Sequence, residues 1–160
     1  MNGVVAGVLF PVVLLANGLS AGVLVWGLLG GWPLMQSLPD DRYVHLHAFM
    51  ATRYDPFMPV CMVVTVAGDV VLALLLPELA GAALAVLAGL LTVSSIGVSL
   101  VKNVPVNKWV RSLDPDALPA DFAQRHPRAA WGRWNTFRSV LVLLAFLANC
   151  VALGLLLGTE

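Results

Sequence analysis

Six polar and aromatic residues in the second half of the chain form its densest group of potential ligand-binding side chains. They are Asn103, Asn107, Trp131, Trp134, Asn135 and Arg138. On a helix, Trp131, Asn135 and Arg138 fall at i, i+4 and i+7 and share a face, and Trp134 shares it with Arg138. Carboxamides can hold a ligand's carbonyl and hydroxyl oxygens, and an arginine beside aromatic rings suits a planar or anionic molecule. Anchoring of Trp and Arg at a membrane surface explains the same residues without a ligand.

Asp69 is an acidic residue inside an otherwise apolar run. Placing a carboxylate near the middle of a membrane costs about 2.5–3.5 kcal/mol even on the mildest scale, so such a residue usually faces the protein interior and has a partner or a function. Asp69 is therefore a candidate catalytic base. The alternative is a structural, protonated Asp69 with a hydrogen-bonding neighbour, and the candidates are Asn17, Ser20, Ser94 and Ser95.

The three histidines differ in what their positions allow. His45 and His47 project about 200° apart on a helix, so both cannot bind one metal from the same face. His47 lies on a semi-apolar stripe and is a second candidate base near neutral pH, whereas His45 and His126 are expected to face water. If the protein holds a transition metal, the sequence allows His47 with Asp55 or Asp69 as ligands but does not demand them.

The elements that position these side chains are predicted to be membrane helices. Of the 160 residues 59% are hydrophobic and 11% are charged, and the mean hydropathy is +0.88. A soluble protein has about 25% charged residues. Each of four apolar runs can cross a hydrocarbon core of about 30 Å as a helix, which predicts spans at about residues 4–30, 57–76, 80–101 and 136–158. The expected fold is all-α, a single four-helix integral membrane domain over residues 1–160.

Two segments between the spans carry most of the polar residues. All nine Lys and Arg residues fall within residues 42–53 and 102–138, which we call the basic windows. With four spans, both windows lie on one side of the membrane and both termini on the other. The positive-inside rule places the windows in the cytoplasm and the termini outside. The Ala, Leu, Val and Arg usage is typical of a GC-rich bacterial genome, and hence of an inner membrane.

The ends of these spans also carry local signals. Gly30-Gly31 followed by Pro33 predicts the end of the first span. Pro39-Asp40-Asp41 predicts the start of an amphipathic helix that lies along the membrane surface or leans over the mouth of the bundle. One face of that helix is semi-apolar and contains Tyr43, Leu46, His47, Met50 and Tyr54. After the third span we expect loops and a short surface helix at 107–113.

Two motifs resemble the paired signature of the anthrone oxygenase-like family, a group of small four-span membrane proteins. They are Asn-Val-Pro-Val-Asn at 103–107 and Trp131-Gly-Arg-Trp-Asn135-x-x-Arg138, and residues 47–59 resemble the family's segment before the second helix. The resemblance implies that Asn103, Asn107, Trp131, Asn135 and Arg138 form the family's polar cluster, with His47 as a weaker correspondence. Many relatives have His at position 135, and the Asn found here would shift the role of a base to His47 or Asp69.

The resemblance implies a membrane oxygenase or oxidase that acts on a lipophilic anthrone-type or phenolic molecule. His47 or Asp69 would remove a proton from an activated carbon. Arg138, with Asn103 and Asn107, would stabilise the resulting enolate or phenolate oxygen. Such an anion can react directly with oxygen, so the chemistry requires no cofactor, and a transition metal at a His/carboxylate site is the alternative.

Two non-enzymatic hypotheses stay open. The protein could bind or transport a lipid- or quinone-like molecule, and a transporter with only four spans predicts a homo-oligomer. It could instead be a structural subunit of a membrane complex. In each case the expected surroundings are the lipid bilayer and a lipophilic small molecule, and the zero net charge gives no reason to expect nucleic acid.

Overall fold

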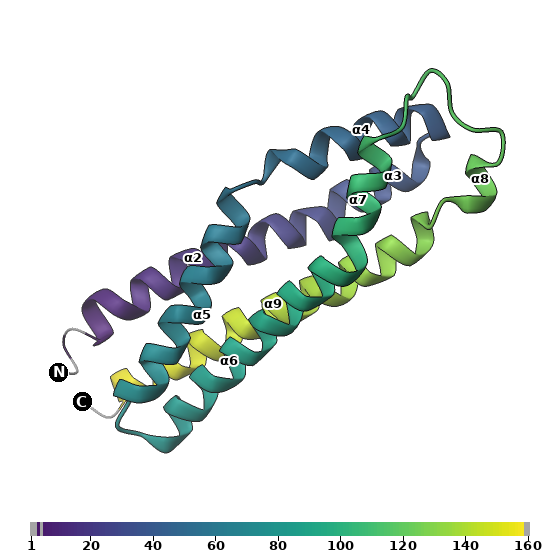
Figure 1. Cartoon of the computed structure of the whole chain (residues 1–160). Coiled ribbons are helices and arrows are strands. Elements are labelled where there is room, and N and C mark those ends of the chain that lie inside the picture. Colours follow the sequence, from purple (N-terminus) through teal and green to yellow (C-terminus); the bar gives the residue numbers. More distant parts are fainter. Residues whose placement is uncertain (1–2, 4, 159–160) are drawn as a thin grey trace.

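The computed structural model describes residue 3 and residues 5–158, and the regular elements there are all helical. In chain order, with η for a π-helical turn, they are η1 (Val5–Leu9), α2 (Phe10–Trp26), η2 (Gly27–Gly31), α3 (Trp32–Ser37), α4 (Asp40–Arg53), α5 (Phe57–Leu75), α6 (Leu79–Val98), η3 (Ser99–Asn103), α7 (Val104–Arg111), α8 (Phe122–Arg125) and α9 (Arg128–Gly158). Figure 1 shows them as a long bundle.

Four helical runs are long and apolar enough to cross a membrane. They are Gly7–Ser37, Phe57–Leu75, Leu79–Arg111 and Phe122–Gly158. The prediction of an all-α, four-span integral membrane protein is confirmed. The turn between α5 and α6 lies with η1 and the end of α9 at one end of the bundle, and both basic windows lie toward the other (Figure 1). We call the latter the basic end.

The prediction that the first helix ends at Gly30-Gly31 is wrong. The helix continues through η2 and α3 to Ser37, and the predicted start at residue 4 lies outside the described residues. Pro33 stands within the first two positions of α3, where a missing N–H is tolerated, so it does not stop the helix. The third span likewise continues through η3 into α7, where Pro105 has the same kind of position. In both places a π-helical turn keeps the backbone hydrogen-bonded, from Trp32 to Gly27 and from Val104 to Ser99.

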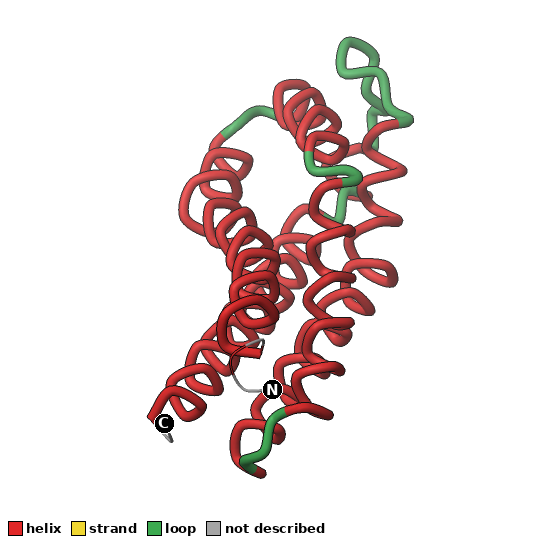
Figure 2. Tube along the Cα trace, turned by 90° about the vertical axis from the view of Figure 1, so that its left-hand side faces the viewer, coloured by secondary structure: helices red, strands yellow, loops and turns green. Residues whose placement is uncertain are grey.

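Helix α4 begins at Asp40, as the sequence predicts. Its buried face contains Tyr43, Val44 and His47, and His45 is exposed. The helix packs against α7 and α3 beyond the end of α5, so it covers the basic end (Figures 1 and 2). An apolar cluster that includes Met35, Val110 and Phe122 joins α3, α4, α7, α8 and α9 there.

Small residues let the long helices approach closely. Helices α6 and α9 pack most extensively, around Ala88, Ala145 and Ala148. A side chain at Gly68 of α5 would collide with Val13 of α2. Close backbone approach of this kind is the main source of packing energy between helices in lipid.

Candidate functional site

A chain of hydrogen bonds links three helices at the basic end. The Tyr43 hydroxyl lies 2.6 Å from Nδ1 of His47, and Nε2 of His47 lies 2.9 Å from Oδ1 of Asn107. The indole Nε1–H of Trp131 donates to the same Asn107 oxygen, also at 2.9 Å. Asn103 donates to the Trp131 carbonyl oxygen at 3.3 Å. The two motifs and α4 therefore meet around one carboxamide.

The indole of Trp131 determines the protonation pattern of this chain. An indole N–H can only donate, so the Asn107 atom that faces it must be the oxygen. That oxygen can only accept, so Nε2 of His47 carries the proton. Nδ1 of His47 is then an acceptor, and the Tyr43 hydroxyl donates to it. Both nitrogens of a neutral imidazole are satisfied.

Burial keeps this group of side chains neutral. His47 is 1% exposed, and burial lowers its pKa below the usual value. A hydrogen bond to Asn107 acts in the opposite direction, and the charge of Arg128 acts in the same direction. Burial also raises the pKa of Tyr43. At neutral pH the His47 imidazole is therefore unprotonated at Nδ1, which is the form that a general base requires.

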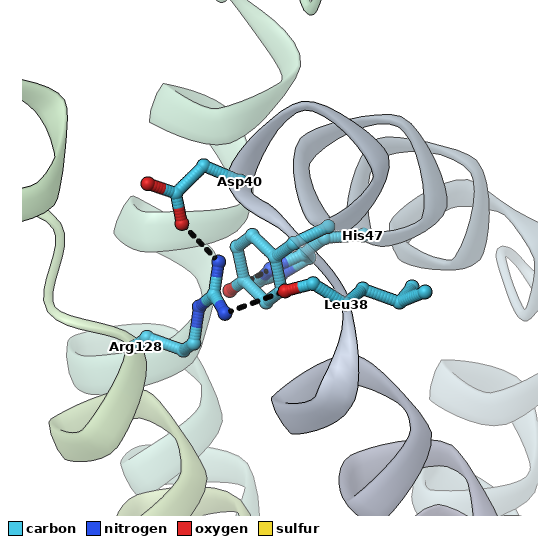
Figure 3. Close-up of polar contacts among 5 residues, drawn as sticks. Leu38, Asp40, His47 and Arg128 are labelled. Carbon is cyan, nitrogen blue, oxygen red and sulfur yellow. Dashed lines mark hydrogen bonds and ion pairs between the residues drawn. The ribbon is translucent and has the colours of Figure 1, made fainter.

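Arg128 closes the basic end above these residues. One of its amino groups donates to the Asp40 carboxylate at 2.7 Å, and the other donates to the Leu38 carbonyl oxygen at 3.2 Å (Figure 3). Its guanidinium also stacks 3.9 Å from the centre of the Tyr43 ring. The ion pair is partly exposed, so its main effect is to hold the start of α9 against α4.

Arg138 lies deeper and has different partners. Its Nε and Nη2 donate to Oδ1 of Asn135 at 3.1 and 2.8 Å, and its Nη1 donates to the Ser99 hydroxyl at 2.9 Å. Among the described residues the ion pairs are those of Arg125 and Arg128, so Arg138 has none. Its cation is therefore held by neutral oxygens, and two of its five N–H groups have no partner there.

The sequence grouping of Arg138 with Asn103 and Asn107 is therefore not what the structure shows. The two asparagines bond to Trp131 and His47, whereas Arg138 bonds to Asn135 and Ser99. Trp134 points outward and is 37% exposed; the Lys102 ammonium lies 5.2 Å from its ring centre. Motif spacing placed these residues on the right helices but did not show how the two clusters divide.

Asp69 lies in a third place, within the apolar part of the bundle. It is 1% exposed, and neither carboxyl oxygen has a hydrogen-bond partner among the described residues. The serine partners considered from the sequence are wrong: Ser20 donates to Ala16, Ser95 donates to the Arg138 carbonyl, and Ser94 is exposed. Asn149 of α9 is the side chain that faces the carboxyl group.

Three functional candidates were missed by sequence reasoning. Asn149 is a single polar residue in an apolar run, and Tyr43 was read only as part of an apolar stripe. His126, expected to be solvated, packs on Tyr43 and Trp109, and both of its nitrogens are buried without a partner among the described residues. None of these belongs to a motif, so only the three-dimensional contacts reveal them.

Two adjoining clefts of about 370 and 340 Å³ open at the basic end between α3 and α9. Trp32, Gln36 and Ala129 line both of them. Their size suits a small organic ligand. The clefts lie on the side of α9 that carries Gly132 and Thr136, and Arg138 does not line them.

The possible metal ligands are not brought together. Both nitrogens of His47 are engaged by Tyr43 and Asn107, and Asp55 is exposed in the turn before α5. Within the part of the chain that the structure describes, no group of three His, Cys, Asp or Glu side chains could hold a metal ion.

The fold and these contacts define a four-span integral membrane protein with polar clusters inside its helical bundle. A family model for anthrone oxygenase matches residues 47–148, which cover all the motif residues described above. The chain belongs to the anthrone oxygenase family and is an oxygenase-like membrane protein. Comparison with curated proteins and with solved structures gives no match.

Proposed function

We propose that this protein is a membrane oxygenase that converts a lipophilic anthrone-type or phenolic molecule to a quinone at the basic end of the bundle, and that this end faces the cytoplasm. The observation that carries the proposal is the Arg138 cation, which has no carboxylate partner among the described residues. A largely desolvated guanidinium with free N–H groups is suited to stabilising an enolate or phenolate oxygen. Family membership supports the choice of substrate class.

Proton removal from the substrate is assigned to His47, acting through Tyr43. The Tyr43 hydroxyl would accept the proton from the ring carbon while passing its own proton to Nδ1 of His47, to which it already donates. Asp69 lies on α5 in the apolar part of the bundle and not at the basic end, so we give it no part in this step. Asn107 and Trp131 position the imidazole and fix its tautomer.

The oxidation can be written with its atoms balanced. Loss of a proton from the ring carbon gives an electron-rich enolate, which transfers electrons to oxygen and forms a carbon–oxygen bond. Protonation gives a hydroperoxide, and elimination of water then leaves the second carbonyl group. The substrate loses two hydrogens and gains one oxygen atom, and oxygen is reduced to water. The side chains supply the base and the cation, so no step depends on a metal.

Oxygen uptake by the detergent-purified protein with an anthrone-type phenol tests the proposal. We expect Arg138→Ala to lower kcat by about 10²–10³-fold, as loss of a preorganised oxyanion donor does. Arg111→Ala is the matched control, because Arg111 is an exposed arginine that lines neither cleft. Protein-free reactions correct for spontaneous oxidation, and thermal melting shows that the variants are folded.

Wild-type protein that gives no uptake above the blank would contradict an oxygenase and favour the binding or structural hypotheses. Uptake that is equal in Arg138→Ala and Arg111→Ala would contradict the assignment of Arg138 alone.

A further inference from the structure

Three polar side chains from three helices are buried in the apolar part of the bundle. They are Asn17 of α2, Asp69 of α5 and Asn149 of α9, and each is at most 1% exposed. All six of their side-chain oxygen and nitrogen atoms lack a hydrogen-bond partner among the described residues. An unpaired polar group costs several kcal/mol in hydrocarbon, so these atoms require an explanation.

The packing brings the Asn149 and Asp69 side chains toward one another. The Asn149 carboxamide is directed at the Asp69 carboxyl group but does not reach hydrogen-bond geometry. Gly89 of α6 closes the opposite side, where a Cβ atom would lie 3.4 Å from Cβ and 3.8 Å from Oδ2 of Asp69. Gly68 packs against Val13, one helical turn from Asn17, so α2 also approaches at this level.

The surrounding helices supply no positive charge. Helices α2 and α6 contain no charged residue, and Asp69 is the one charged residue of α5. The basic residues of α9 are Arg128, Arg133 and Arg138, and the nearest of them is eleven residues from Asn149, about 16 Å along the axis. The other titratable side chains on these helices are the thiols of Cys61 and Cys150. An ionised Asp69 would therefore be an uncompensated charge in lipid.

We propose that Asp69 binds a proton in the folded protein and, as a neutral carboxylic acid, pairs with Asn149 across the bundle core. The Asp69 hydroxyl would donate to Oδ1 of Asn149, and Nδ2 of Asn149 would donate to the other Asp69 oxygen. A carboxylic acid and a carboxamide can form this reciprocal pair with a small rotation of either side chain. A proton also needs no space, which suits the close packing at Gly89.

The proposal is independent of the oxygenase function, because it concerns a site that the reaction does not use. Asn17 of α2 is a third polar side chain buried in the apolar part of the bundle. The neutral pair would hold α5 and α9 in register, because breaking it leaves polar atoms unpaired in lipid.

Infrared spectroscopy of the full-length protein in lipid at pH 7 tests this directly, since a protonated carboxyl group has a C=O band distinct from that of a carboxylate. We expect this band in the wild type, its loss in Asp69→Asn and its retention in the control Asp55→Asn, whose carboxyl group is exposed. In Asn149→Leu the band should move to higher frequency, because the C=O group loses its hydrogen bond.

The wild-type spectrum decides the proposal even if a variant does not fold. Absence of the band at pH 7, or a band that persists in Asp69→Asn, would overturn it. A band that does not move in Asn149→Leu would overturn the pairing with Asn149.

Discussion

Arg128 and Arg138 lie on the same helix, and their partners give them different properties. Arg128 has a carboxylate, a carbonyl oxygen and an aromatic ring around it, so its charge is compensated at the protein surface. Arg138 has one carboxamide and one hydroxyl group as side-chain partners among the described residues. The same side chain therefore closes the structure at one position and has two N–H groups without a partner among the described residues at the other.

The neutral state of His47 has a measurable consequence for stability. Because burial lowers its pKa in the folded protein, the unfolded chain binds more protons in the pH range below its ordinary value of about 6.5. The contribution of His47 is present above that pH and is lost as the pH falls. We expect wild-type melting temperature in detergent to decrease from pH 7.5 to pH 5 more than that of His47→Gln.

His45→Gln is the control for this comparison, since His45 is exposed on the same helix. It should follow the wild type. Equal pH dependence in His47→Gln and the wild type would contradict a buried, neutral His47.

At the scale of elements, the contact between α3 and α9 depends on one glycine. A Cβ atom on Gly132 would overlap the Trp32 ring, and a ring cannot yield as a flexible chain end does. This close contact holds the extended end of the first span against the start of the fourth. It also forms the wall of the clefts that share Trp32.

Gly132→Ala should destabilise the protein by about 1–3 kcal/mol, as overpacking of a tight contact usually does. Thermal unfolding in detergent measures the effect. Gly154→Ala is the control, because nothing lies within 4 Å of a Cβ atom there. Adding Trp32→Leu should restore part of the loss, and a Gly132→Ala protein as stable as Gly154→Ala would contradict the contact.

The existence of the four long helices could be predicted from the sequence more accurately than the residues at which they end. Hydropathy identified the four spans because lipid requires about 20 consecutive apolar residues in each. The end of the first helix was predicted wrongly from Gly30-Gly31 and Pro33. These stop signals describe helices in water, where the backbone groups of a broken turn can be hydrated. Here the chain instead forms a wide turn followed by more helix.

The arrangement of the candidate site could be predicted in part from the sequence. His47 and the two motifs were recognisable because their polar residues depart from an apolar pattern, and burial of His47 and exposure of His45 agree with helical spacing. The division between the Asn107 and Arg138 clusters depends on how α7 and α9 are rotated about their axes. No partner could be predicted for Asn149, because the carboxyl group that it faces belongs to Asp69 on another helix.

At the scale of the whole molecule, the two ends of the bundle differ in charge and in the helices that pack over them. The basic end has α4, α7 and α8 packed over it, whereas the turn between α5 and α6 at the opposite end is short (Figure 1). This asymmetry agrees with a fixed orientation in the membrane.

Cysteine labelling should place the two ends on opposite sides. In a background of Cys61→Ala and Cys150→Ala, we expect Glu78→Cys to react with a membrane-impermeant maleimide on intact cells. Ser112→Cys should react only after permeabilisation. Both positions are exposed, so access depends on the side of the membrane. Labelling of both from the same side would contradict the four-span topology, and the reverse pattern would contradict the cytoplasmic assignment.

The wide turns η2 and η3 affect how the helices meet around the site. In each, an N–H bonds five residues back, from Trp32 to Gly27 and from Val104 to Ser99. Such a turn holds one residue more than an α-helical turn, so everything beyond it is rotated by about 100° relative to an uninterrupted helix. Without the wide turn, an uninterrupted α-helix of the same sequence would carry Trp32 about 100° around the axis, away from Gly132. The rotation of these two helices about their axes at the basic end is therefore set by two extra residues, one in η2 and one in η3.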